Sequence, residues 1–181
     1  MPQTVLDGNT ATGATGVKRK FRQVSVRRWS IVSQKSFESV VASVEAEIGR
    51  PDMSGFRSRL KAASTYEELE DVVRQAISPI GFMEFFRIDA GAVLAKAGVS
   101  GNPQSVRLII GNPLIMQSLA RLVPDAVSYA PLTILIDRRA DGVHLTYDEM
   151  SSYLAPYENI EALQIAQDLD VKVKRLLHKA S

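Results

Sequence analysis

Apolar residues recur along the chain with two periods, and the changes of period predict the order of helices and strands. A spacing of three or four positions is typical of a helix with one buried face, whereas alternation or a short apolar run is typical of a strand. The first pattern predicts helices at 36–49, 53–64, 65–77, 90–98, 112–123 and 158–179. The second predicts strands at 23–33, 82–89, 105–111 and on both sides of Asp141-Gly142, which is a tight-turn signal.

The first predicted strand contains a change of parity. Val24 and Val26 share one face of an extended chain, while Trp29 and Ile31 share the other. A β-bulge between the two pairs would reconcile them.

The stretch Gly111-Asn112-Pro113 separates two apolar runs and predicts a switch from strand to helix. Gly111 lets the chain turn sharply, Asn112 is a favourable N-cap, and Pro113 suits the first helical position. Backbone N–H groups at such a helix start can hold an anion, but the P-loop pattern is absent. We therefore interpret the triplet as architectural.

This order of elements predicts an α+β fold. We expect a two-layer sandwich with a mixed sheet of about five strands, helices packed mainly on one face, and a long C-terminal helix. Residues 23–181 are predicted to form one domain, and residues 1–22, rich in Thr, Gly and Ala, a disordered basic tail.

Composition narrows the chemistry. The 181 residues include no cysteine, which excludes disulfides, iron–sulfur clusters and thiol catalysis. No apolar run approaches the twenty residues of a membrane span, and the first residues lack a hydrophobic signal core. We expect a cytoplasmic protein that does not enter a membrane.

The net charge is only +2, but cations gather near the N-terminus. This segment could contact nucleic acid or an acidic partner, or be a solvated arm before the first strand. Because the chain carries no nucleic-acid motif, we favour the solvated arm. The cations are Lys18, Arg19, Lys20, Arg22, Arg27 and Arg28.

Candidate site residues lie near the ends of predicted strands, where α/β sites tend to assemble. Two histidines and no cysteines argue against a zinc site, and no cofactor motif is present, so we predict neither metal nor cofactor. Asp89, Asn112, Asp137 and Tyr147 could converge at one sheet edge and bind a polar ligand or a hard cation; ordinary turn and capping roles are the alternative. The predicted ligand-binding residues are Arg87, Asp89, Asn112, Asp137, His144 and Tyr147.

Three segments resemble a known family in order and spacing. They are "GFMEFFRIDAGAVL", "SVRLIIGNPLIMQSL" and "APLTILIDRRADGVHLTYDEMSSYLAPY". They are similar to the bacterial family called domain of unknown function 302, over roughly residues 24–157. The resemblance implies an α+β sandwich that is often dimeric, and no assigned activity. The family usually carries a histidine after the Ile-Asp of the first segment, where this chain has Ala90.

Two functional hypotheses follow. The first is a homodimeric module that binds a small molecule or a partner and has no chemistry of its own. The second is a cofactor-independent lyase, isomerase or hydrolase that acts through carboxylate and tyrosine groups at the sheet edge. The scarcity of histidine and the absence of cysteine and cofactor motifs favour the first.

Overall fold

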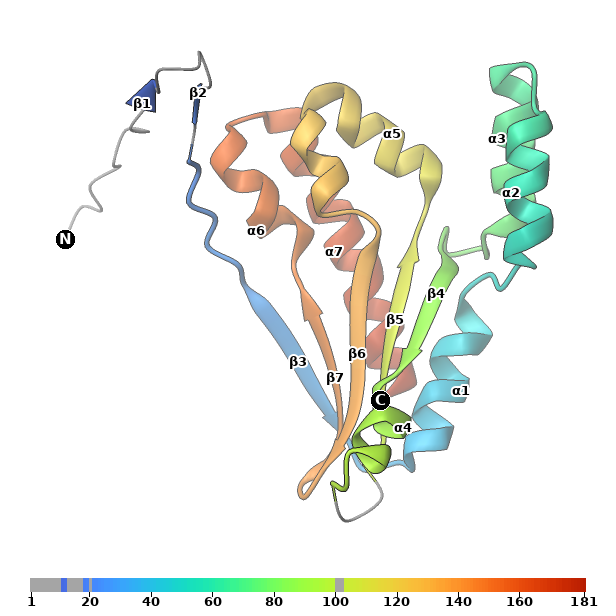
Figure 1. Cartoon of the computed structure of the whole chain (residues 1–181), viewed down its shortest axis with the longest axis vertical. Helices are drawn as coiled ribbons and strands as arrows, with labels where there is room; N and C mark the ends of the chain where they lie inside the picture. Colours follow the sequence, from blue (N-terminus) through green and yellow to red (C-terminus); the bar gives the residue numbers. More distant parts are fainter. Residues whose placement is uncertain (1–10, 13–17, 20, 100–102) are drawn as a thin grey trace.

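A computed structural model describes residues 11–12, 18–19, 21–99 and 103–181. Its centre is a five-stranded sheet in the order β3-β7-β6-β5-β4 (Figure 1). These strands are β3 (Arg28–Ser33), β4 (Met83–Asp89), β5 (Ser105–Gly111), β6 (Leu132–Arg139) and β7 (Gly142–Asp148). A separate two-stranded pair joins β1 (Ala11–Thr12) and β2 (Lys18–Arg19).

The helices pack mainly on one face of this sheet, with α7 lying behind the strands in the view of Figure 1. They are α1 (Phe37–Glu47), α2 (Met53–Ala62), α3 (Tyr66–Ala76), α4 (Ala90–Lys96), α5 (Pro113–Leu122), α6 (Met150–Leu154) and α7 (Ile160–Ala180). Two 3-10 turns, η1 (Pro124–Ser128) and η2 (Ala155–Tyr157), complete the described elements. None of the helices in the described ranges combines the length and apolar character that a membrane span requires.

The predicted α+β class and long C-terminal helix are confirmed, but the five-stranded sheet is antiparallel throughout rather than mixed. The connections explain the difference. The chain passes from β4 to β5 through α4, and from β5 to β6 through α5 and η1, so that each segment turns at one end of the sheet. A parallel pair would need a crossover along the face of the sheet.

The core lies between the sheet and the helices α1 and α7. The strands alternate, so that every second side chain enters this core, as the period of two requires. The inward residues are Val106, Leu108 and Ile110 of β5, Leu132, Ile134 and Ile136 of β6, and Val143, Leu145 and Tyr147 of β7.

Strand β3 begins only at Arg28, so the parity change between Val26 and Trp29 needs no bulge there. The described sheet has its irregularity in β4 instead, where the register shifts between Glu84 and Phe86. Phe85 is the extra residue at this point.

Helices α2 and α3 pack over the edge strand β4 through a small apolar cluster of their own. Phe56, Val73 and Met83 are buried in it. The chain enters this hairpin at Gly49, whose N–H donates to the carbonyl of Phe82 and whose carbonyl accepts from the N–H of Glu84. Gly49 thereby extends the sheet by one isolated parallel bridge, to Met83.

Candidate functional site

An apolar cavity of about 250 Å³ lies where β5 passes into α5. Helices α2, α6 and α7 and the first residues of β6 complete its wall. The lining residues are Phe56, Leu60, Phe85, Gly111, Asn112, Pro113, Ile115, Met116, Leu119, Ala130, Pro131, Leu132, Met150 and Leu169.

The predicted strand-to-helix switch forms one side of this cavity. The side-chain oxygen of Asn112 accepts from the N–H of Leu114 at 2.9 Å, and Pro113 opens α5, as its sequence position predicts. Gly111, however, does not have a positive φ. A Cβ at this position would lie 3.3 Å from Cε2 of Phe85 and 3.4 Å from Cβ of Pro131. The space beside the cavity at this position is therefore tight for a larger residue, and no sharp turn calls for the glycine.

The β4 bulge supplies the aromatic wall. Phe85, its extra residue, is half-buried and lines the cavity, whereas its neighbour Phe86 pairs with Ile109 and is exposed. Bulges commonly re-aim a side chain in this way. The sequence pattern 82–89 gives no sign of the bulge, because its residues are apolar on both parities near Phe85.

Among the residues that the structure describes, no charged side chain lines the cavity. Pro113 and Pro131 have no backbone N–H. The Asn112 side chain already makes two hydrogen bonds within the chain. Its N–H₂ group donates to the carbonyl of Gly81 at 3.0 Å, and its oxygen accepts from the N–H of Leu114. The wall can therefore offer apolar contact but little hydrogen bonding.

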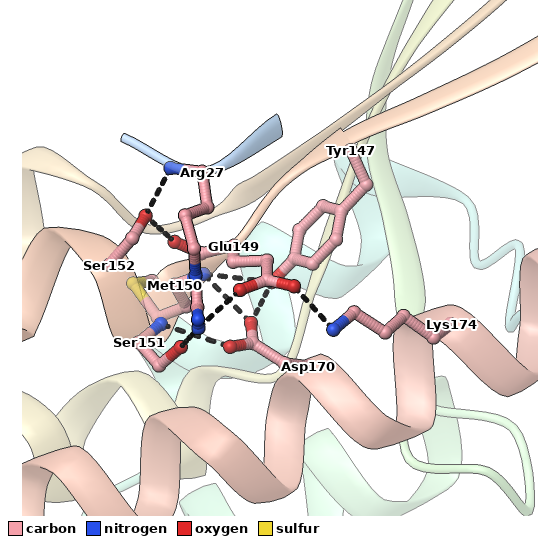
Figure 2. A network of polar contacts seen from close by, with 8 residues as sticks. All are labelled: Arg27, Tyr147, Glu149, Met150, Ser151, Ser152, Asp170 and Lys174. Carbon is pink, nitrogen blue, oxygen red and sulfur yellow. Dashed lines mark hydrogen bonds and ion pairs between the residues drawn. The ribbon is translucent and has the colours of Figure 1, made fainter. Parts of the chain in front are cut away.

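Behind the cavity, a buried carboxylate anchors the start of α6 (Figure 2). Asp170 of α7 is 4% exposed, and its oxygens accept from the Tyr147 hydroxyl at 2.7 Å, the Met150 N–H at 2.8 Å and the Ser151 N–H at 3.1 Å. Burial, together with the Asp170 charge, raises the pKa of Tyr147, so its hydroxyl stays a donor. Met150, a wall residue, is held directly by this group.

A second buried carboxylate, Glu149, joins three elements (Figure 2). Its oxygens form ion pairs with Lys174 of α7 and, at 2.6 Å, with Arg27 just before β3. The backbone N–H of Arg27 also donates to the Ser152 hydroxyl at 3.1 Å. Both oxygens of Asp170 accept hydrogen bonds, and both oxygens of Glu149 lie in ion pairs, although Oε2 of Glu149 has no partner with hydrogen-bond geometry among the described residues. These contacts suit a structural role for the two carboxylates.

Three arginines of the basic N-terminal segment, Arg22, Arg27 and Arg28, contact the folded domain. Arg22 lies 4.0 Å over the ring of Tyr157 and donates to the carbonyl of Pro156, and Arg28 forms two hydrogen bonds with Asp148 at 2.7 and 2.8 Å. The Arg28 guanidinium lowers the pKa of Asp148. Together with Arg27, three of the six N-terminal cations therefore contact this chain itself. Most of the predicted tail, including Lys20, lies outside the described residues.

The six predicted ligand-binding residues do not meet at one sheet edge. Asn112 follows the end of β5, and Tyr147 lies in the half of β7 nearest that end. Asp137 pairs with Ser105, and Asp89 with Val106, at the opposite end. Of the six, only Asn112 lines the apolar cavity.

The other predicted residues have partners nearby. Asp89 caps α4 by accepting from the N–H of Ala92 at 2.8 Å, and Arg87 binds Glu84 at 2.9 Å and also Glu45 of α1. His144 lies opposite Asp137 on the sheet face away from the core, with its Nε2 2.8 Å from Asp141. Within the described ranges, no three His, Asp or Glu side chains gather as a metal site would require.

Sequence reasoning missed the residues that matter most here. The pattern of apolar positions does not distinguish Phe56, Phe85 and Met150 from other core residues. Asp170 does not stand out either, because its helix contains many charged residues. The available signal for Asp170 was its spacing, because it falls on the apolar stripe between Ala166 and Val173, where a charge needs a partner.

The family described as "Domain of unknown function DUF302" matches residues 56–180. The chain belongs to the DUF302 family. Its match includes α7 and begins in α2, so it lies further along the chain than the 24–157 expected from the sequence segments.

Comparison with solved structures agrees. The crystal structure of an uncharacterized conserved DUF302 protein from Bacillus stearothermophilus superposes with a TM-score of 0.61 at 10% identity. The match covers 85% of this chain and 98% of the other, and establishes a shared fold. A comparison with curated proteins found no match.

Proposed function

We propose that this DUF302 protein is a small-molecule-binding module without chemistry of its own, and that its ligand enters the cavity beside Gly111. The observation that carries the proposal is a cavity of about 250 Å³ whose wall holds no charged side chain. A concave, mostly apolar pocket is the usual form of a small-molecule site.

Catalysis has weaker support. A general acid or base needs a carboxylate or phenol within reach of a bound substrate. The Tyr147 hydroxyl donates a hydrogen bond to Asp170 at 2.7 Å, and neither residue lines the cavity. Asp89 and Asp137 lie at the other end of the sheet. The enzyme hypothesis therefore lacks a reacting group at the described cavity.

Filling the cavity tests the proposal. In Gly111→Ala the new methyl group would lie against Phe85 and Pro131 and reduce the space for a ligand. We expect binding of a neutral two-ring fluorescent probe, 6-propionyl-2-(dimethylamino)naphthalene, to weaken by about tenfold, the cost of losing roughly 1.4 kcal/mol of contact.

Thr133→Val is the matched control, since Thr133 of β6 has the strand parity opposite to the buried Leu132 and does not line the cavity. Fluorescence titration of both variants gives the comparison. Equal probe affinity in Gly111→Ala and wild type would contradict the proposed site.

We also propose that the module is a homodimer joined through the open face of the sheet. In the described part of the chain this face carries exposed apolar groups at both edges, Val32 on β3 and Phe86 and Ile88 on β4. It also carries both signs of charge, Arg107 on β5 and Asp137 on β6. A second copy related by a two-fold axis can cover the apolar groups and oppose the charges.

Phe86→Glu tests this interface. Phe86 is exposed in the single chain and would be buried in the proposed dimer. A carboxylate at this position should weaken association at least about tenfold, because an unpaired charge is costly to bury. Analytical ultracentrifugation should show the mass falling from two chains to one. Val127→Glu on η1 is the control, with a side chain of similar exposure away from the sheet. A wild-type monomer, or an unchanged mass for Phe86→Glu, would refute the interface.

A further inference from the structure

We propose that the ligand of this cavity is a neutral aromatic molecule of one or two rings. The inference rests on the proposed function and gives the ligand its chemical class. It depends on three properties of the described cavity: its size, the groups that face it, and the charges that it lacks.

The size limits the ligand to a small molecule. The volume is about 250 Å³. An apolar protein cavity of roughly 150 Å³ already accepts benzene, so this cavity has room for one substituted ring or two fused rings.

The wall presents groups that favour an aromatic ring. Two aromatic residues, Phe56 of α2 and Phe85 of β4, line the cavity, and so do two methionines, Met116 of α5 and Met150 of α6. Offset ring pairs and sulfur–ring contacts are each favourable beyond the apolar area that they bury. A saturated hydrocarbon of the same size gains the burial but not these contacts.

The wall does not suit a charged ligand. The described residues that line it include no Arg, Lys or His, and the oxygen and the nitrogen of the Asn112 amide each already have one partner within the chain. A carboxylate inside the cavity would lose its water without gaining a cation, which is strongly unfavourable. The ligand that fits is therefore uncharged.

Toluene, methylcyclohexane and benzoate distinguish these properties when titrated calorimetrically into the full chain. Methylcyclohexane leaves water more readily than toluene, so an indifferent apolar cavity would bind methylcyclohexane more tightly. We expect the reverse, with toluene favoured by about threefold to tenfold through its ring contacts, and no measurable binding of benzoate.

The outcomes separate the two proposals. Tighter binding of methylcyclohexane would overturn the aromatic preference and leave the proposed function intact. Binding of benzoate as tight as that of toluene, or tighter, would overturn the requirement for a neutral ligand. If neither hydrocarbon binds, the proposed function itself fails.

Neighbouring residues of β4 provide matched variants. Phe85→Leu removes a ring from the cavity and should abolish the preference for toluene, whereas Phe86→Leu, whose side chain is outside the cavity, should keep it. Met116→Leu preserves volume and removes a sulfur, and should reduce the preference by about twofold or more. If both cavity variants fold and keep the full preference, the assigned aromatic contacts are wrong.

Discussion

Asp170→Asn should destabilise the protein by about 3 kcal/mol, because it disrupts a buried set of three hydrogen bonds. The carboxylate accepts from Tyr147, Met150 and Ser151. An amide in its place keeps one acceptor oxygen and turns an N–H₂ group towards one of these donors. At least one buried donor would then lose its partner.

Urea unfolding measures this loss as a shift of the midpoint at constant slope. The control is Asp168→Asn, two residues earlier on α7, where the side chain is exposed and accepts only from Gln164 at 3.2 Å. Its effect should stay within about 0.5 kcal/mol. Similar midpoints for the two variants would show that the Asp170 contacts contribute little to stability.

The Asp170 substitution should also affect the cavity. Asp170 holds the backbone N–H of Met150, whose side chain lines the wall. We expect Asp170→Asn to weaken probe binding under conditions where the variant remains folded, while Asp168→Asn leaves binding unchanged.

Gly49→Ala should have a comparable or larger effect on stability. A Cβ at Gly49 would lie 2.0 Å from the carbonyl oxygen of Ala76, the last residue of α3. This contact is with backbone, which cannot swing away as a flexible side chain can. Relief of the overlap would separate α3 from the start of β4 and strain the two hydrogen bonds that Gly49 shares with Phe82 and Glu84.

The expected loss is about 3 kcal/mol or more, at the upper end of the range for overpacked sites. Gly55→Ala is the control within α2. There the new Cβ would lie 2.8 Å from Oδ2 of Asp52, the exposed N-cap side chain that accepts from the Gly55 N–H. This side chain can rotate, unlike a backbone carbonyl, and the higher helix propensity of alanine offsets the weakened cap. Thermal unfolding should therefore separate the midpoints of the two variants by at least about 6 °C, and a neutral Gly49→Ala would exclude the close packing described at Ala76.

The strands of the main sheet and six of the described helices were predictable because each has a strong local signal, whereas the short helix α6 (Met150–Leu154) was not predicted. Thr65 caps α3 by accepting from the N–H of Glu68 at 3.2 Å. The Glu68 carboxylate accepts in turn from the N–H of Ser64. In a regular capping box it would accept from the N–H of Thr65 itself. Asn112 and Pro113 open α5 where the sequence places it. Such signals depend on residues within one turn of each other, so a single sequence contains them.

The cavity could not be predicted in the same way. Its wall joins Phe56, Phe85, Met116, Met150 and Leu169, which are far apart in the chain and meet only after the strands pair. The predicted set of polar residues failed to converge because antiparallel strands place successive strand ends at opposite edges of the sheet. The expectation rested on the position of these residues near strand ends, and successive strand ends lie together only where neighbouring strands are parallel.

The β4 bulge and the Gly49 bridge also disfavour edge-to-edge assembly of many copies of this protein into a fibre. An open sheet can grow into a fibre when the last strand of one copy pairs with the first strand of the next. Here that would require β3 of one molecule to add along β4 of another. The start of β4 is already paired with Gly49, and the extra residue Phe85 breaks the regular spacing of the free groups beyond it. Strand β4 is therefore a poor template, and assemblies of this protein should end at a small, closed number of copies rather than extend as amyloid-like ribbons.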